Sequence, residues 1–167
     1  AKAELVAGCF SRTHEKTLET GQRFGIEADR CYTDFKEMAK SEAAREDGID
    51  FVVITTPNSS HYDAAKAFLE AGINVVCEKP VTTKLETALE LKKLAEEKDL
   101  LFMVAYTYTG HVTAKNIRAI IKAGEIGEVR TVMGEYPQGW LALETDHGGK
   151  KGAWRTDPAL AGRTNAL

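Results

Sequence analysis

The sequence predicts an α/β fold built around a parallel β-sheet. Four short apolar runs are typical of buried strands, because a strand that is covered on both faces need not alternate polar with apolar side chains. These runs span residues 5–10, 51–55, 75–77 and 100–105. Helical patterns separate them, and this alternation of strands with helices favours right-handed crossovers and therefore parallel strands.

The helical patterns follow the runs in order. The clearest repeats at the i, i+3, i+4, i+7 and i+8 spacing of one helix face. Its members are His61, Ala64, Ala65, Phe68 and Leu69. A further helix is predicted over residues 85–95, with Thr83 and Glu86 as a capping box. Helices over residues 15–24 and 34–45 extend the alternation back to the first run.

We predict two domains, over residues 1–105 and 106–167, because the character of the sequence changes between them. The second begins with a polar, aromatic segment and continues into a helical pattern over residues 117–124. Residues 128–136 alternate imperfectly and predict a strand of a different, antiparallel sheet. Residues 137–152 are rich in glycine and mixed charges, which is typical of a long loop.

The composition is that of an ordinary globular chain and disfavours several classes of function. Its 167 residues carry 22 Lys and Arg against 25 Asp and Glu, for a net charge of −3. No continuous basic stripe offers a surface to nucleic acid, and no apolar window approaches the ~20 residues that span a bilayer. The three cysteines have no Cys-x-x-Cys spacing, which fits the cytoplasm. No set of His, Cys and carboxylate residues has the spacing of a metal site.

Polar residues follow the second apolar run. This is the carboxyl end of a predicted parallel strand, where open α/β sheets bind their ligands. The segment is Thr56-Pro57-Asn58, with His61 at the start of the next helix. It is a candidate cofactor edge. Taken alone, however, the segment is better explained as the start of a helix. Pro57 would restrict the backbone before the first turn, and His61 would hydrogen-bond a nearby carbonyl.

A second polar segment, Glu78-Lys79-Pro80, puts an acid and an amine at the same edge. A salt bridge and a turn would explain this pair. Alternatively, Lys79 hydrogen-bonds a substrate hydroxyl or carbonyl, where a positive charge stabilises the oxygen as hydride moves, or where the amine accepts the proton.

Together these motifs stand in the order and spacing of one family. The matching residues are Thr56-Pro57-Asn58, His61, Gly72, Glu78-Lys79-Pro80, Gly124-Glu125-Ile126-Gly127 and Trp154-Arg155. The chain resembles the glucose-fructose oxidoreductase, inositol 2-dehydrogenase and rhizopine-catabolism family of nicotinamide-dependent dehydrogenases. The resemblance implies a Rossmann-type doubly wound parallel sheet, followed by the start of an α+β substrate domain with a mainly antiparallel sheet.

The resemblance also implies roles for individual residues. The cofactor edge would comprise Thr56, Pro57, Asn58, His61, Glu78 and Lys79. Lys79 would also touch the reacting oxygen as the catalytic residue, and its bond to Pro80 is often cis in the family. The residues on the substrate side would be Tyr106, Tyr108, Trp154 and Arg155, for which packing between domains is the alternative.

The segment after the first apolar run bears on the choice of cofactor. A carboxylate there would hold the adenosine ribose of NAD, whereas a cation accepts the 2′-phosphate of NADP. The chain has Ser11, Arg12 and Thr13 and no acid. We therefore expect NAD or NADP, with a lean toward NADP, although Arg12 could instead be a solvated residue of the first helical turn.

Two features of the family have no match. No Gly-x-Gly-x-x-Gly loop precedes Leu5, and the Asp and His that the family uses in catalysis have no counterpart before Leu167. We therefore expect the 167-residue chain to be either a fragment of a longer protein or a truncated member of the family. Family habit implies a homo-oligomer, either a dimer or a tetramer.

The expected function is that of an NAD(P)-dependent oxidoreductase, which transfers hydride between nicotinamide and a sugar, polyol or related carbinol. The alternative is a catalytically inactive protein on the same scaffold that senses dinucleotides in regulation.

Overall fold

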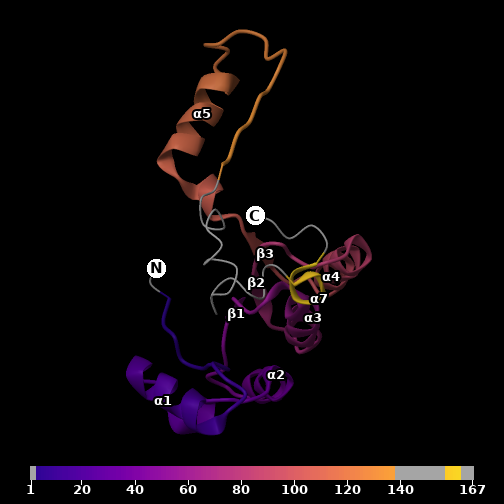
Figure 1. Cartoon of the computed structure of the whole chain (residues 1–167). Coiled ribbons are helices and arrows are strands. Elements are labelled where there is room, and N and C mark those ends of the chain that lie inside the picture. The colour runs from indigo at the N-terminus through magenta and orange to yellow at the C-terminus, as the bar shows by residue number, and fades with distance from the viewer. Residues whose placement is uncertain (1–2, 138–156, 163–167) are drawn as a thin grey trace. The chain divides into compact units, whose positions relative to one another are not determined.

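The computed structural model describes residues 3–137 and 157–162. The chain divides into two compact units, Ala1–Val104 and Ala105–Leu167 (Figure 1). Within the described residues, no helix is both long enough and apolar enough to cross a membrane.

A three-stranded sheet in the order β1-β2-β3 organises the first unit. The strands are β1 (Phe51–Ile54), β2 (Asn74–Glu78) and β3 (Phe102–Ala105). β1 and β2 run parallel, with Phe51 opposite Asn74 and Ile54 opposite Cys77. The predicted parallel pairing of these two strands is therefore confirmed.

Two helices connect the strands in turn, α3 (His61–Glu70) between β1 and β2 and α4 (Leu85–Glu97) between β2 and β3. The predicted helices are confirmed, but the capping box at Thr83 and Glu86 is wrong. The N-cap of α4 is Lys84, and its side chain makes no capping bond. The hydroxyl of Thr87 instead donates to the Lys84 carbonyl at 2.9 Å.

One face of the sheet packs against α3 and α4 to form the hydrophobic core. Its most deeply buried members are Phe68, Leu69, Val75, Cys77 and Leu91. Burial of each large aliphatic or aromatic side chain contributes ~1.5–3 kcal/mol. The side chains that alternate to the other face are more open, since Phe51, Val53 and Met103 are 42%, 54% and 55% exposed. The described sheet is thus covered on one face only.

The N-terminal part of the first unit contains α1 (His14–Phe24) and α2 (Phe35–Ala43), which confirm the helices predicted there. α1 ends at Gly25, whose φ of 73° is the left-handed conformation that favours glycine. α2 begins after Asp34, whose carboxylate accepts hydrogen bonds from the second and third amides of the helix.

The strand predicted over residues 5–10 is wrong. Within this run Gly8 forms an isolated parallel bridge with Cys31, while Leu5 and Phe10 are 50% and 37% exposed. An apolar run becomes a regular strand only where a neighbouring strand completes its ladder of hydrogen bonds. Among the described residues, this run forms a bridge with another segment only at Gly8, which pairs with Cys31.

A buried ion pair joins the N-terminal elements to each other. Arg30 lies directly before the bridge residue Cys31, and its guanidinium donates through two nitrogens to the carboxylate of Glu42 on α2. The hydroxyl of Tyr32 donates to the same carboxylate at 2.9 Å. Burial, followed by the Glu42 carboxylate, raises the pKa of Tyr32 to about 12. This network fixes the position of α2 through polar contacts inside the core.

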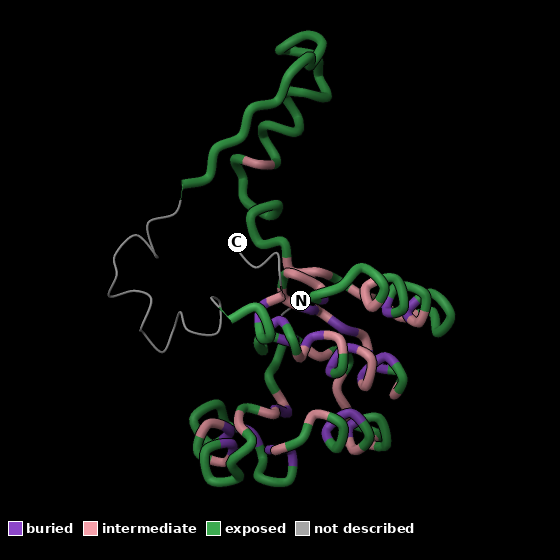
Figure 2. The backbone as a smooth tube through the Cα atoms, turned by 45° about the vertical axis from the view of Figure 1, so that its right-hand side comes forward, coloured by how far each residue is buried: buried purple, intermediate pink, exposed green. Residues whose placement is uncertain are grey.

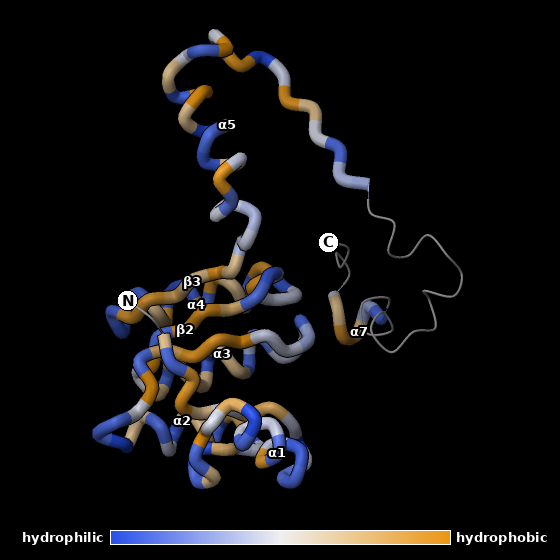
Figure 3. Tube along the Cα trace, turned by 90° about the vertical axis from the view of Figure 1, so that its left-hand side faces the viewer, coloured by the Kyte–Doolittle hydropathy of each residue, from blue (hydrophilic) through white to orange (hydrophobic). Residues whose placement is uncertain are grey.

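The second unit contains α5 (Val112–Lys122) and the short helix α7 (Pro158–Ala161), and α5 confirms the helix predicted there. The large apolar residues of α5 are exposed, and most of the helix is coloured as exposed in Figure 2. They alternate with polar ones along the helix (Figure 3). The strand predicted over residues 128–136 is wrong, because this segment has no regular secondary structure. It has no partner strand in the described part of the chain, and Val132 and Met133 are 84% and 92% exposed.

Candidate functional site

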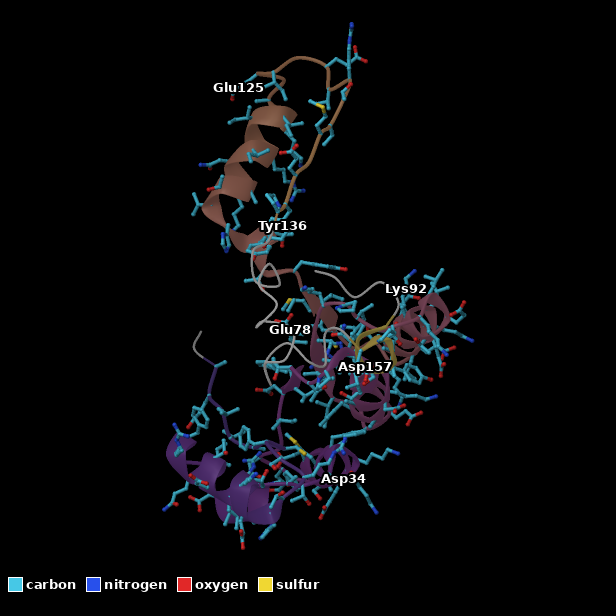
Figure 4. The ribbon with its side chains drawn as sticks, in the orientation of Figure 1. Asp34, Glu78, Lys92, Glu125, Tyr136 and Asp157 are labelled. Carbon is cyan, nitrogen blue, oxygen red and sulfur yellow. The ribbon has the colours of Figure 1, made fainter. Side chains whose placement is uncertain are left out.

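Two turns lie together at the carboxyl ends of β1 and β2. Because Ile54 is opposite Cys77, the residues that follow each strand emerge at the same edge of the sheet. The turn after β1 carries Thr56, Pro57 and Asn58. β2 ends at Glu78, which Figure 4 labels, and the turn after it begins at Lys79. The structure thus brings together the two segments that the sequence singled out.

The turn after β1 is held by its own hydrogen bonds. Pro57 precedes the 3-10 helix Asn58–Ser60. The Ser60 hydroxyl donates to the Thr56 hydroxyl at 2.7 Å and lies 2.8 Å from the Pro57 carbonyl. Asn58 is buried, whereas Thr56 and Pro57 are exposed. The turn is therefore held by internal hydrogen bonds, and its exposed residues at this edge are Thr56 and Pro57.

The last residue of β2 and the turn after it combine a half-buried carboxylate with an exposed amine. The Glu78 carboxylate accepts a hydrogen bond from the Lys79 amide at 3.1 Å, and the Lys79–Pro80 peptide bond is cis, as the resemblance implies. Lys79 itself is exposed. The edge thus offers a cation that can reach a ligand, placed beside a fixed negative charge.

Cys77 lies directly before this turn and is fully buried. Burial, and then the negative charge of Glu78, raise the pKa of its thiol to about 12. The thiol is therefore protonated at neutral pH, and Cys77 acts as part of the core rather than as a nucleophile.

His61 lies behind the edge rather than on its surface. Its ring is fully buried. Nε2 lies 2.7 Å from the Thr56 carbonyl oxygen and Nδ1 lies 2.8 Å from the Pro80 carbonyl oxygen. Both ring nitrogens are thus occupied by the backbone of the two turns.

Ser11, Arg12 and Thr13, the residues predicted to meet the adenosine end of the cofactor, form a third turn, which precedes α1. Arg12 and Thr13 are exposed, and the Ser11 hydroxyl accepts a hydrogen bond from the Thr13 amide at 3.1 Å. Thr13 is the N-cap of α1, and its side chain makes no capping bond. The first turn of the helix therefore keeps amides that could meet an anion.

Sequence reasoning missed Thr17, which organises this turn. Its buried hydroxyl accepts from the amides of Phe10 and Ser11 at 3.1 and 3.0 Å and lies 3.2 Å from the Tyr32 carbonyl. The available signal was a lone polar residue on the inner face of a predicted helix, one turn after the candidate residues.

The predicted substrate-side residues fall in the second unit or outside the described residues. Tyr106 and Tyr108 are exposed, and the hydroxyl of Tyr108 lies 2.9 Å from that of Tyr136. Trp154 and Arg155 lie outside the described residues. Within the described ranges, no three His, Cys, Asp or Glu side chains form a group that could hold a metal ion.

The fold and the edge are those of a dinucleotide-binding α/β protein. Residues 1–106 match the model of the Gfo/Idh/MocA oxidoreductase family, described as having an NAD-binding Rossmann fold. The chain belongs to this family, which confirms the resemblance drawn from its motifs.

Individual relatives support this assignment. The chain is 42% identical to an uncharacterised oxidoreductase of Bacillus subtilis, YfiI, over 98% of its own length and 42% of the relative. It is 34% identical to a D-xylose 1-dehydrogenase (NADP+) of Hypocrea jecorina over 77% of the chain and 32% of the relative. In the crystal structure of an inositol dehydrogenase homologue with NAD+ from Azotobacter vinelandii, the match covers 95% of this chain and 41% of that one, with 39% identity and a TM-score of 0.90. The chain therefore spans less than half the length of these proteins.

Proposed function

We propose that the protein is an NAD(P)-dependent oxidoreductase that transfers hydride between nicotinamide and a carbinol carbon of a sugar, polyol or related compound. One observation carries the proposal. Glu78 and Lys79 lie beside the Thr56–Asn58 turn at one sheet edge, in a family with an NAD-binding Rossmann fold. The D-xylose and inositol names of two relatives support a polyhydroxylated substrate.

The residues at the edge fit a nicotinamide nucleotide. The exposed Pro57 and the buried Asn58 would lie against the nicotinamide ribose, and Thr56 would belong to the same cofactor edge. Glu78 and Lys79 would lie beside the nicotinamide ring. When bound, the nicotinamide supplies the acceptor or donor of hydride. His61 would support this edge from behind.

Lys79 is the residue that we assign to chemistry. When a carbinol is oxidised, the hydride leaves carbon with its electron pair, and the hydroxyl must lose its proton. A lysine that hydrogen-bonds this oxygen stabilises the negative charge that develops on it, or takes the proton as a free amine. The adjacent Glu78 carboxylate, already bonded to the Lys79 amide, fixes the backbone from which that side chain extends.

The turn before α1 favours NADP over NAD. Ser11, Arg12 and Thr13 provide a guanidinium, two hydroxyls and the uncapped start of a helix. A guanidinium pairs with phosphate through two parallel hydrogen bonds. The relatives include both a protein crystallised with NAD+ and an enzyme named for NADP+.

The second unit would be the start of the substrate domain. Tyr106, Tyr108, Trp154 and Arg155 would face the substrate. Their aromatic faces and guanidinium group are suited to stacking against a sugar ring and bonding its hydroxyls.

The test uses the full-length protein and measures NADH and NADPH binding by fluorescence titration, then turnover with a panel of sugars and polyols. Lys79→Ala is expected to lower turnover by about 10³-fold, while the dissociation constant of the cofactor changes little. The matched control is Lys92→Ala, which removes an exposed lysine on α4 (Figure 4). Cofactor binding without turnover on any member of the panel would favour the regulatory alternative, and absence of binding would refute both.

A further inference from the structure

We propose that His61 is the positioning residue that sets Lys79 in place, by clamping together the two turns at the sheet edge. This inference rests on the proposed function, in which Lys79 touches the reacting oxygen. Its structural basis is independent of any ligand, because it consists of contacts within the first unit.

The two carbonyls that His61 joins belong to different strands. The Thr56 carbonyl lies in the turn after β1 and the Pro80 carbonyl lies in the turn after β2, at 2.7 and 2.8 Å from the ring. Backbone pairing of β1 and β2 ends at Ile54 and Cys77. The ring therefore continues the connection between the two strands beyond the last paired residues.

The clamp is rigid because it is buried. The ring is fully inaccessible to solvent, so its two nitrogens have the backbone carbonyls and not water as partners. His61 is also the first residue of α3, whose inner face packs into the core through Phe68 and Leu69. The position of the ring is thereby set by the helix, and the helix is set by the core.

Histidine suits this place because its flat ring carries two nitrogens, and one of them faces each carbonyl oxygen. Phenylalanine keeps the ring volume and has no donor, and glutamine keeps a donor at one end. These two variants separate the hydrogen bonds from the packing.

The effect on Lys79 passes through one peptide unit. The Pro80 carbonyl follows the residue whose side chain would meet the substrate, so release of this carbonyl frees the backbone that aims the amine. A displacement of about 1 Å at a reacting group can cost on the order of 10²-fold in rate. We expect His61→Phe to lower kcat by that factor and His61→Gln to recover part of it.

The decisive experiment is a double-mutant cycle in the full-length protein. If His61 acts through Lys79, His61→Phe is expected to lower kcat by about 10²-fold alone and by less than about twofold in a Lys79→Ala background. An equal loss in both backgrounds would overturn the proposal, because it would show a general structural effect. Tyr32→Phe, which removes a buried hydrogen bond in the Arg30–Glu42 network, controls for loss of stability.

A second readout does not depend on turnover and separates this proposal from the proposed function. In protein labelled with ¹⁵N-lysine, the Lys79 amide signal is expected to shift or broaden in both His61→Phe and His61→Gln, and to stay unchanged in Tyr32→Phe. An unmoved Lys79 signal in both His61 variants would refute the clamp even if the enzyme is active. A displaced signal in a protein without turnover would support the clamp and count against the assigned chemistry.

Discussion

The first unit contains two pairs of oppositely charged residues that differ in how far they are buried. Arg30 and Glu42 are buried, with side chains 8% and 0% exposed, and their hydrogen-bonding groups are used within the protein. At the sheet edge Glu78 is half-buried and Lys79 is exposed. The same two kinds of charge therefore serve structure in one place and are presented to solvent in the other. Burial, more than residue type, separates the pair that stabilises the fold from the pair that we propose meets a ligand.

Neutralising one member of the buried pair is expected to have the largest effect on stability. Glu42→Gln leaves the Arg30 guanidinium without its main partner, and we expect a loss of about 3–5 kcal/mol in the free energy of unfolding. The surface change Lys79→Met is expected to alter stability by no more than about 0.5 kcal/mol. Urea denaturation followed by circular dichroism measures both. A stability loss of similar size in the two variants would contradict the distinction.

Thr17 provides the next largest expected effect, because its hydroxyl serves two amides of the turn before α1. Thr17→Val keeps the shape and leaves these buried groups without their partner, at a cost of about 1–3 kcal/mol. Thr17→Ser restores the hydroxyl and should recover most of this loss. If valine and serine variants unfold at the same urea concentration, the hydroxyl does not hold the turn.

Arg12 tests whether an exposed charge has a ligand. Arg12→Ala is expected to weaken NADPH binding about tenfold, which corresponds to ~1.4 kcal/mol, and to change NADH binding little. The control is Arg23→Ala, which removes an exposed arginine from the last turn of α1. Equal weakening of both cofactors would place Arg12 away from the 2′-phosphate.

Tyr32 is expected to show its effect at alkaline pH. Its pKa is raised from 10.0 to about 12, by burial first and then by Glu42. The folded protein therefore holds this proton more tightly than the unfolded chain does. The stability it contributes is fully present below pH 10 and is lost as pH rises from 10 toward 12. Unfolding of Tyr32→Phe over this range should depend less on pH than unfolding of the natural protein.

The elements that sequence analysis predicted correctly are those whose signal is local. The pattern at His61 to Leu69 specifies a helix face by its spacing alone, and Gly25 takes the left-handed conformation expected after a helix. The segments at residues 5–10 and 128–136 were predicted as strands and form none, because a strand depends on a partner elsewhere in the chain. Sequence composition describes the run and says nothing about its neighbour.

The candidate site shows the same division. Motif order was enough to predict that the segments around Asn58 and Lys79 belong together, because consecutive parallel strands end at one edge. The carbonyl partners of His61 and the amide partners of Thr17 could not be predicted, since backbone atoms carry no residue-specific signal. The sequence identifies these two side chains as polar residues on helices, and the fold determines what they bond.

The burial of Cys77 has a consequence for how the protein would meet oxidative stress. Oxidants and alkylating agents attack the exposed thiolate, and this thiol is fully buried, with a pKa of about 12. The residue next to the proposed catalytic turn is thereby shielded from covalent damage while the edge stays closed. The rate at which a thiol reagent labels Cys77 would report how often β2 unfolds locally. Cys77 is therefore a built-in probe of local unfolding at the sheet edge.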